Sequence, residues 1–574
     1  MAGPVDQRVV RYDPERVARN LASGEWSAVP LARRFQDVAR RFPDRPAVVD
    51  RVGSVTYEEL DRRTDLVAAG LLGSGLAPGD PVLFQVWNGI PGVVAWYGVL
   101  KAGAIPVATL PAHRSHEIDH IARLVGAVGH VVDDSRHARF DLVAFARERA
   151  AARPTPTHLY VTDSDRADVA GASLLEALGA DIDPAEARAA VDAVQERIGP
   201  EQVAVHQLSG GTTGVPKVIP RLHGEYWNNG LAWARALGRT EHSVVAHAGP
   251  FVHNAGISCG LHSAHAVGGC IVLPQADRDP VLRMMAEHRV DDTLLGQGMF
   301  HWILGEDYPA AAEHLRTVVL SGAKVPAEVF ARVESLGARV GQTFGMGEGM
   351  FTLTPLDGPR HLRATTVGPP LTPGDEARVL EPGTEVEVTD GEVGELVCRG
   401  WYTIPGYFAA PDHNATAFTS DGFYRTGDLA RVHAHDGQRY LSIEGRIKDL
   451  INRGGEKVNA EELESLLLRH PAISEAAVVA MPDPVMGERV CAYVVSVDPA
   501  LGVPELQVHL DALGVAKYKW PERVEHIDAL PRTLVGKLDK KALRADIVLR
   551  SDPHPALARG ALPDRSDRPI ERDG

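Results

Sequence analysis

The fold class is indicated by residues 81–110, PVLFQVWNGIPGVVAWYGVLKAGAIPVATL. It contains the apolar run VLFQV (82–86), then VVAWYGVLKAG (93–103) with the character of a helix, and then the apolar run IPVATL (105–110). A strand, a helix and a second strand in this order predict two parallel strands joined by a helix that covers them.

The same alternation extends upstream of this segment. AVVD (47–50) predicts a strand, and Thr56 with Glu59 has the spacing of a capping box at the start of a helix. We therefore expect an α/β fold with a large N-terminal domain of parallel sheets covered by helices. The stretch 141–200 is rich in Ala, Arg and Asp and predicts surface helices.

The composition is that of a globular protein with more than one domain. The chain has 574 residues, 44% of them hydrophobic and 24% charged, and a chain of this length folds as two or more domains. Its formal charge of −16 disfavours nucleic acid and anionic membranes as partners. Four widely spaced cysteines and the lack of a long apolar run predict a soluble cytoplasmic protein.

The sequence pattern changes after residue 446. ISEAAVVAMPD (473–483) and ERVCAYVVSVD (488–498) predict strands, and AEELESLLLRH (460–470) predicts an amphipathic helix, which together indicate a small α+β domain. The final residues are rich in Pro, Asp and Arg and predict disorder. We expect an N-terminal core at 1–446, a C-terminal subdomain at 447–548 and a disordered tail at 549–574.

LSGGTTGVPKVIPR, residues 208–221, has the composition of a phosphate-binding loop. Three glycines allow the backbone to close on an anion, three hydroxyls can donate to it, and a lysine adds positive charge. These residues are Gly210, Gly211, Gly214, Ser209, Thr212, Thr213 and Lys217. The spacing from Gly214 to Lys217 is not that of a Walker A motif. A glycine-rich surface turn is the alternative interpretation.

Four more segments follow the loop in order: FGMGEG (344–349), YRTGDLA (424–430), EGRIKDLINRGGEKV (444–458) and PRTLVGKLDKKAL (531–543). Together the five resemble the core motifs of the adenylate-forming superfamily, which includes acyl-CoA synthetases, nonribosomal peptide adenylation domains and firefly luciferases. The resemblance spans residues 30–548. The pair His253–Asn254 and the segment INRGGEKV are most similar to the stand-alone aryl acid–AMP ligases of siderophore and antibiotic assembly lines.

The resemblance implies an ATP-dependent ligase. A carboxylate would displace pyrophosphate from ATP, and a thiol would then displace AMP from the acyl-adenylate. ATP and Mg²⁺ are the implied cofactors, with no covalently bound group. Lys537, Glu348 and Lys217 match catalytic positions, with Glu348 as the Mg²⁺ ligand. The implied nucleotide-binding residues outside the loop are Gly322, Ala323, Lys324, Phe344, Gly345, Met346, Asp428 and Arg446.

The resemblance also implies that the C-terminal subdomain is mobile and rotates between the two half-reactions. Lys448 takes the hinge position, and Gly454 and Gly455 lie on the loop that would face the thiol. The implied partners are an aromatic carboxylic acid and a stand-alone aryl carrier protein or a carrier domain in trans. Coenzyme A is the alternative acceptor.

The predicted acid pocket lies around GPFVHNAGISCGLHSAH. Asn254 matches the amide that binds an ortho substituent, and Cys259 favours salicylate because a thiol serves a 3-hydroxyl poorly. Ala255, Gly298 and Phe351 depart from the usual pattern, which makes 3-hydroxyanthranilate a close alternative. 2,3-Dihydroxybenzoate and 3-hydroxypicolinate also remain open. The predicted aryl acid-binding residues are His253, Asn254, Ala255, Cys259, Gly298, Gly347 and Phe351.

Two functions of other classes are weaker interpretations. A P-loop NTPase or kinase would need a lysine directly after the last glycine of the loop. A non-catalytic nucleotide binder would be expected to lack Lys537, Asp428 or Glu348, and the sequence has all three.

Overall fold

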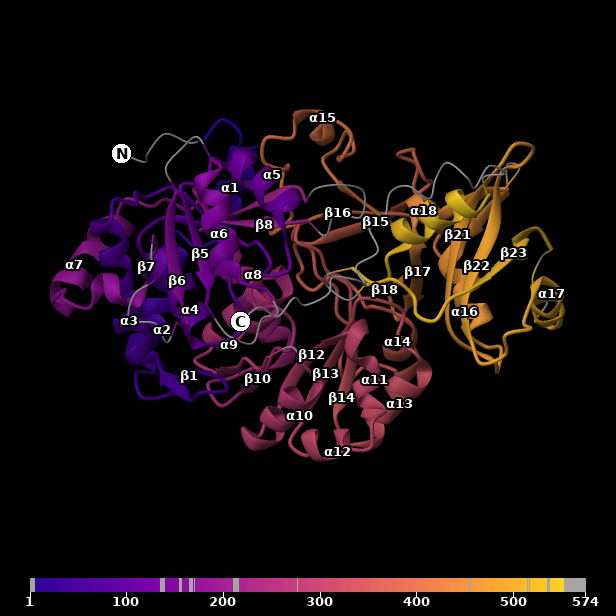
Figure 1. The fold of residues 1–574 in the computed structure, drawn as a ribbon, viewed down its shortest axis with the longest axis horizontal. Helices are drawn as coiled ribbons and strands as arrows, with labels where there is room; N and C mark the ends of the chain where they lie inside the picture. Colours follow the sequence, from indigo (N-terminus) through magenta and orange to yellow (C-terminus); the bar gives the residue numbers. More distant parts are fainter. Residues whose placement is uncertain are drawn as a thin grey trace, which may run out of the picture. The chain divides into compact units, whose positions relative to one another are not determined.

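The computed structural model describes residues 6–134, 140–153, 157–164, 169, 171–209, 216–275, 277–453, 456–513, 515, 517–533 and 537–551. The chain divides into two compact units, Met1–Ile443 and Glu444–Gly574 (Figure 1). Within the described ranges, every helix is too short or too polar to cross a bilayer.

The larger unit contains a seven-stranded sheet built around the segment 81–110. Its strand order is β7-β6-β5-β3-β4-β8-β9, parallel except for the hairpin β8/β9. The strands are β3 (Pro81–Gln85), β4 (Ile105–Val107), β5 (Gly129–Asp133), β6 (His158–Thr162), β7 (Ser173–Leu174), β8 (Val203–Leu208) and β9 (Val218–Leu222). Helix α4 (Ile90–Lys101) connects β3 to β4, so the predicted strand–helix–strand unit is confirmed.

The prediction of surface helices for 141–200 is wrong in part. Helices α6 (Leu142–Ala151) and α7 (Pro184–Gln195) form, but His158–Thr162 is a strand that pairs with β5. Its residues Leu159, Tyr160 and Val161 are buried, and α6 packs on β5 and β6 (Figure 1). The short apolar run HLYVT is a buried strand inside a mostly polar stretch, and the composition of the whole stretch concealed it.

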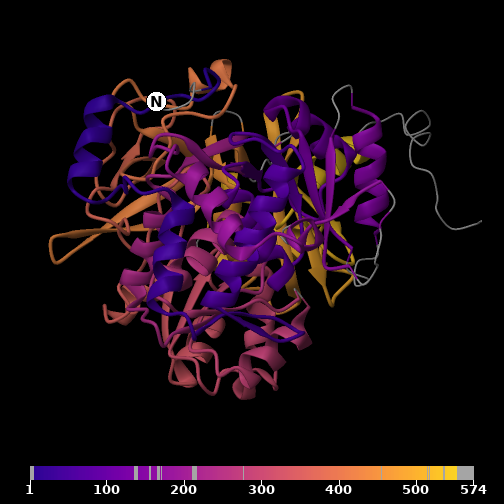
Figure 2. The same ribbon diagram turned by 90° about the vertical axis from the view of Figure 1, so that its left-hand side faces the viewer.

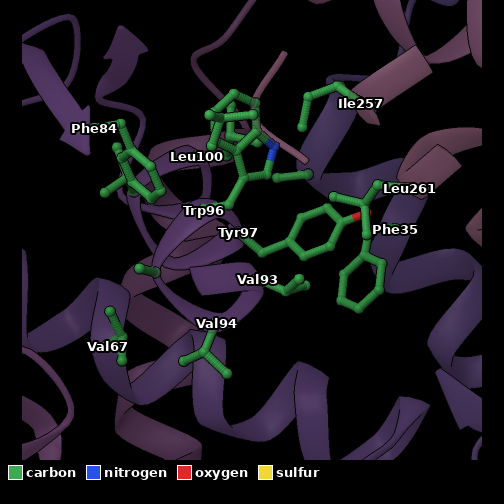
Figure 3. Packing of buried hydrophobic residues seen from close by; sticks show 14 of the residues in the cluster. Phe35, Val67, Phe84, Val93, Val94, Trp96, Tyr97, Leu100, Ile257 and Leu261 are labelled. Carbon is green, nitrogen blue, oxygen red and sulfur yellow. The ribbon is translucent and has the colours of Figure 1, made fainter. Parts of the chain in front are cut away.

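Helix α4 lies in the main core of this unit and is buried around its whole circumference. Figure 3 shows its residues Trp96 and Tyr97 among large apolar side chains from other elements. Tyr97 stacks on Phe35 of α2 (Leu31–Arg41) with ring centroids 4.1 Å apart, and Trp96 meets Phe84 edge-on at 5.4 Å. A helix that is apolar on all sides is stable only when it is covered on all sides, and α4 is.

Helix α3 (Tyr57–Gly73) packs against α4. As predicted, it begins at the cap residue Thr56, whose side chain accepts a hydrogen bond from Glu59 N at 3.2 Å. Gly98 of α4 allows the close approach, because a Cβ there would overlap Val67 of α3.

A second seven-stranded sheet has the order β14-β13-β12-β10-β11-β1-β2 and is parallel except for β1/β2. Its strands are β1 (Pro46–Val49), β2 (Ser54–Thr56), β10 (Val244–Ala246), β11 (Cys270–Val272), β12 (Asp292–Gly296), β13 (Thr317–Ser321) and β14 (Arg339–Thr343). Figures 1 and 2 show β12–β14 beside short helices of the same region. These helices are α10 (Arg278–Glu287), α11 (Phe300–Ile303), α12 (Tyr308–Ala311), α13 (Ala327–Ser335) and α14 (Arg360–Thr365).

A four-stranded sheet with the order β15-β16-β17-β18 follows in the sequence. The strands are β15 (Glu376–Leu380), β16 (Val393–Arg399), β17 (Tyr424–His435) and β18 (Gln438–Arg446). The YRTGDLA motif begins β17. The other helical segments of the larger unit are α1 (Pro14–Ala22), α5 (Ser115–Val125), η1 (Glu176–Gly179), α8 (Tyr226–Leu237), η2 (Gly256–His262), α9 (Ser263–His265), η3 (Gln297–Met299) and α15 (Pro411–Asn414).

The smaller unit is α+β, with one five-stranded sheet and its helices. Both predicted strands form, as β21 (Ile473–Asp483) and β22 (Gly487–Ser496), and the predicted helix is α16 (Ala460–Leu467). The other elements are η4 (Ile447–Asp449), β19 (Leu450–Arg453), β20 (Glu456–Asn459), α17 (Val503–Ala512), η5 (Lys517–Lys519), β23 (Arg523–His526) and α18 (Lys540–Ser551). Most of the expected tail, residues 552–574, lies outside the described residues.

Candidate nucleotide and acid site

Three groups of predicted residues follow neighbouring parallel strands. In register, Gly296 of β12 pairs with Ser321 of β13, and Ser321 pairs with Thr343 of β14. Each pairing residue is the last of its strand, so the segments that follow begin at one edge of the sheet. The segments contain Gly298, then Gly322, Ala323 and Lys324, then Phe344, Gly345 and Met346. The carboxyl edge of a parallel sheet is where ligands of α/β proteins bind.

Asn254 connects the predicted acid pocket to this edge. Its Oδ1 accepts a hydrogen bond from Tyr226 Oη at 3.0 Å, and its Nδ2 donates to Met346 O at 3.3 Å. Gln207 Nε2 in turn donates to the Tyr226 hydroxyl at 3.0 Å. The amide is buried and fixed in orientation. An amide has two N–H donors and two acceptor lone pairs, so one of each remains for a ligand.

Cys259 and Phe351 lie in one apolar cluster with Trp233 and Val319. Cys259 belongs to η2, a π-helical segment that follows His253, Asn254 and Ala255, and burial raises the pKa of its thiol well above the usual range. The thiol therefore stays neutral and presents a small apolar surface.

Phe351 packs directly on Gly345. The two residues form an isolated β-bridge, and a Cβ at Gly345 would overlap the Phe351 ring. The ring also meets Trp233 edge-on, with centroids 5.6 Å apart. The structure thus brings Cys259, Gly345 and Phe351 together in one apolar region.

Glu348 lies in a network of tyrosines. The carboxylate is buried, and its Oε1 accepts a hydrogen bond from Tyr407 Oη at 2.6 Å. The Tyr407 and Tyr424 hydroxyls are 2.7 Å apart. Lys217 Nζ lies 5.3 Å from the centroid of the Tyr407 ring, so two predicted catalytic residues contact the same tyrosine.

The donor chemistry at Glu348 fits a magnesium ion. Mg²⁺ prefers oxygen ligands and is commonly bound through one or two carboxylates together with substrate phosphates. In the part of the chain that the structure describes, no cluster of three or more His, Cys, Asp or Glu side chains could form a metal site by itself. Glu348 is therefore a candidate for a single-carboxylate site that a nucleotide completes.

Gly347, the residue before Glu348, is bound through its backbone. Its carbonyl oxygen accepts a hydrogen bond from Arg221 Nη1 at 2.8 Å. A Cβ at Gly347 would lie 2.8 Å from Ile219 Cδ1. Arg221 and Ile219 belong to β9, so the strand after the phosphate loop packs against the Glu348 turn.

The predicted phosphate loop joins β8 to β9. Its ends are closed by hydrogen bonds from Ser209 N to Lys217 O at 2.9 Å and from Lys217 N to Ser209 Oγ at 3.0 Å. Gly210, Gly211, Thr212, Thr213 and Gly214 lie outside the described residues.

Asp428 is a buried residue of β17. Its backbone N–H donates to Thr426 Oγ1 at 3.0 Å, and Thr426 Oγ1 donates to Leu396 O at 2.8 Å. These bonds fix the backbone of β17 at Asp428, opposite an irregularity in its pairing with β16.

The remaining predicted residues belong to the smaller unit. Arg446 ends β18 and Lys448 lies in η4, both with exposed side chains. Lys537 is exposed and follows the residues 534–536, with hydrogen bonds between Thr533 N and Lys537 O at 2.6 Å and between Lys537 N and Thr533 Oγ1 at 3.2 Å. Gly454 and Gly455 lie outside the described residues.

Sequence reasoning missed the residues that orient the predicted ones. Tyr407 and Tyr424 contact each other beside Glu348, and Tyr226 binds Asn254. Tyr424 is the first residue of the YRTGDLA motif, so the sequence did contain a signal for this tyrosine. Tyr226 and Tyr407 lie outside the five motifs. An aromatic residue outside a motif is ordinarily interpreted as part of the hydrophobic core.

Comparisons with known proteins identify the family of the chain. Residues 35–408 match the family described as AMP-binding enzyme, and residues 462–537 match the AMP-binding enzyme C-terminal domain. The chain is 40% identical over 552 residues to a Streptomyces protein named salicylyl-CoA synthase / salicylate adenylyltransferase, covering 94% of this chain and 97% of that one. It is 38% identical over 557 residues to the salicyl-AMP ligase / salicyl-S-ArCP synthetase of Mycobacterium tuberculosis, covering 95% of each chain.

The fold is also found among solved structures. The apo structure of MbtA from Mycobacterium smegmatis superposes with a TM-score of 0.69 at 36% sequence identity, covering 94% of this chain and 98% of that one. The expected α/β architecture is thus confirmed. The chain belongs to the AMP-binding enzyme family and is an adenylate-forming ligase.

Proposed function

We propose that this ligase activates a small aromatic carboxylic acid as its adenylate and then transfers the aryl group to a thiol. The observation that carries the proposal is the fixed Asn254 amide, bound to Tyr226 and Met346 next to the carboxyl edge of the β12–β14 sheet. The apolar residues Cys259 and Phe351 supply a hydrophobic wall in the same region. An apolar pocket with one well-placed amide suits a ring with a polar ortho substituent.

In the first half-reaction, a carboxylate oxygen of the acid attacks the α-phosphorus of ATP, and the bond to pyrophosphate breaks. Both reactants are anions, so positive charge and positioning supply most of the catalysis. We assign this charge to Lys217 beside the phosphate loop and to Lys537 of the smaller unit. Glu348 would hold Mg²⁺, which neutralises phosphate charge when bound. Asp428 would accept the ribose hydroxyls.

In the second half-reaction, a thiol sulfur attacks the carbonyl carbon of the adenylate and AMP leaves. We assign the hinge between the two states to Lys448, three residues after Gly445, whose φ is +134°. The loop with Gly454 and Gly455 would face the thiol. The two relatives are named for coenzyme A and for a carrier protein, respectively. We favour a carrier protein in trans, in the cytoplasm and in siderophore or antibiotic synthesis.

Salicylate is the favoured acid, since both relatives are named for it. The neutral, buried Cys259 offers no strong hydrogen-bond partner for a 3-hydroxyl. We infer that the small side chain of Ala255 would admit a 3-substituent, so 3-hydroxyanthranilate is the second candidate.

The proposal is tested by detecting the products directly. The enzyme is incubated with ATP, Mg²⁺ and one acid from a panel of benzoic, anthranilic and picolinic acids, and the adenylate is measured by mass spectrometry. Coenzyme A or a phosphopantetheinylated aryl carrier protein is then added. We expect salicyl-adenylate and faster release of AMP with the carrier protein. Adenylates of aliphatic acids alone would contradict the proposal.

Asn254→Leu is expected to lower activity selectively on acids with an ortho hydroxyl or amino group. A buried polar substituent without its partner costs about 1–3 kcal/mol, or roughly ten- to a hundredfold in rate. The measurement is the ratio of kcat/KM for salicylate to that for benzoate, because a general loss of structure cancels in the ratio.

Tyr226→Phe is the companion variant. It removes the hydrogen bond that orients the Asn254 amide and keeps the amide itself, so the ratio should fall to a smaller degree than in Asn254→Leu. An Asn254→Leu enzyme with the wild-type ratio would show that the amide does not bind the ortho group.

Gly345→Ala is expected to destabilise the larger unit. The added Cβ would overlap the Phe351 ring, and overpacking of this kind costs about 1–3 kcal/mol. The double variant Gly345→Ala/Phe351→Leu should recover most of the loss in thermal stability. Gly73→Ala is the control, because a Cβ at Gly73 meets nothing within 4 Å. Failure of the second substitution to rescue stability would rule out the packing explanation.

A further inference from the structure

Among the residues that the structure describes, Tyr407 donates a hydrogen bond to the Glu348 carboxylate. The Tyr407 hydroxyl has one hydrogen, and it points to Glu348 Oε1 at 2.6 Å. The 2.7 Å contact between the two tyrosine hydroxyls must then be donated by Tyr424. The result is a directed chain from Tyr424 through Tyr407 to Glu348.

The Tyr407 hydrogen bond has a carboxylate oxygen as its acceptor. A charged acceptor makes this bond short and strong.

The backbone of Tyr407 is fixed independently of this chain. Its N–H donates to Asn414 Oδ1 and its carbonyl oxygen accepts from Asn414 Nδ2, both at 2.9 Å. The ring packs against His413, with centroids 5.0 Å apart. The tyrosine is therefore held in place before any ligand binds.

The backbone of Glu348 is fixed as well. Its carbonyl oxygen accepts from Ile404 N at 2.9 Å. The next residue, Gly349, has φ of +134° and lies so close to Tyr402 O that a Cβ would overlap it. The main mobility left to Glu348 is rotation of its side chain, which the Tyr407 hydroxyl restricts.

The face of the Tyr407 ring also contacts Lys217. Lys217 Nζ lies 5.3 Å from its centroid, within the range of a cation–π contact. One side chain thus orients the carboxylate through its hydroxyl and the lysine through its ring.

We propose that Tyr407 is a positioning residue, which binds Glu348 Oε1 so that the other carboxylate oxygen remains for Mg²⁺ and which places Lys217 beside the phosphate loop. This inference rests on the proposed function, since it requires Glu348 to bind the metal of a nucleotide complex. Residues that orient a metal ligand typically change metal affinity or activity by about 10- to 100-fold when they are replaced.

Two substitutions separate the contact of the Tyr407 hydroxyl with Glu348 from the contact of its ring with Lys217. Tyr407→Phe removes the hydroxyl and keeps the ring, whereas Tyr407→Leu removes both. Mn²⁺ binding in the presence of ATP and without acid is measured by electron paramagnetic resonance, which requires no turnover. We expect Tyr407→Phe to weaken Mn²⁺ binding by about 10- to 100-fold. ATP binding in EDTA should be unchanged in Tyr407→Phe and about two- to fivefold weaker in Tyr407→Leu.

Tyr402→Phe is the matched control, because Tyr402 Oη also donates to a glutamate, Glu25 Oε2, at 3.1 Å outside the predicted site. It should bind Mn²⁺ as the wild type does. If Tyr407→Phe does not fold, Tyr424→Phe replaces it, since that variant removes the donor to Tyr407 and should weaken Mn²⁺ binding to a smaller degree. Wild-type Mn²⁺ affinity in folded Tyr407→Phe, or in Tyr424→Phe where it stands in, would overturn the inference. Failure of the wild-type enzyme to bind Mn²⁺ with ATP would instead overturn the proposed function, and the inference with it.

Discussion

Lys537→Ala is expected to reduce adenylate formation by about two orders of magnitude or more, the size of effect seen when one preorganised charge is removed from a reacting group. Lys537 lies in PRTLVGKLDKKAL and has an exposed side chain, so its removal leaves no cavity. The expected loss therefore arises in the reaction and not in the fold. The measurement is acid-dependent ATP–pyrophosphate exchange, with circular dichroism to show that the variant is folded.

Lys541→Ala is the matched control. It removes an exposed lysine four residues later, and its exchange rate should stay near that of the wild type. Near-normal exchange in folded Lys537→Ala would show that the catalytic lysine is another residue.

Arg221→Met is expected to lower the stability of the larger unit by about 3–5 kcal/mol, because it leaves a buried carboxylate without its cation. Arg221 binds Glu225 through two hydrogen bonds of 2.8 and 2.6 Å, and both side chains are 0% exposed. Arg221 also donates to Gly347 O, so the turn before Glu348 loses a contact. Urea denaturation followed by tryptophan fluorescence measures the effect. The smaller unit contains one tryptophan, Trp520, so the fluorescence signal comes mainly from the larger unit.

The double variant Arg221→Met/Glu225→Leu tests the cause of that loss. Replacing both members of a buried ion pair by apolar residues is often nearly neutral. Part of the stability should return, although Leu222 N loses its acceptor Glu225 Oε1. A double variant as unstable as the single one would show that the unpaired charge is not the cause.

The parts of the fold that depend on local sequence could be predicted. The Thr56 cap, the strand–helix–strand unit around α4 and the pair β21/β22 all form where apolar spacing and capping residues indicate them. The strand β6 could not be predicted from the composition of its surroundings. Four of its five residues are buried, because β5 pairs with the strand and α6 packs on it.

The candidate site also contains residues that could be predicted from the sequence and residues that could not. Motifs identify Asn254 and Glu348, because the residue types and their order in the sequence are specific. Their partners could not be predicted, since Tyr407 is 59 residues from Glu348 and Tyr226 is 28 residues from Asn254. A contact over such a separation is created by the packing of β9, α8 and the segment before α15, and no local pattern encodes it.

Acid-dependent ATP–pyrophosphate exchange reports reversible adenylate formation without any thiol acceptor, and it is therefore the decisive measurement for this enzyme. We expect exchange that requires both Mg²⁺ and an aromatic acid and that is faster with salicylate or 3-hydroxyanthranilate than with benzoate. Exchange that is equally fast without any acid, or that occurs with aliphatic acids and not with aromatic ones, would contradict this expectation.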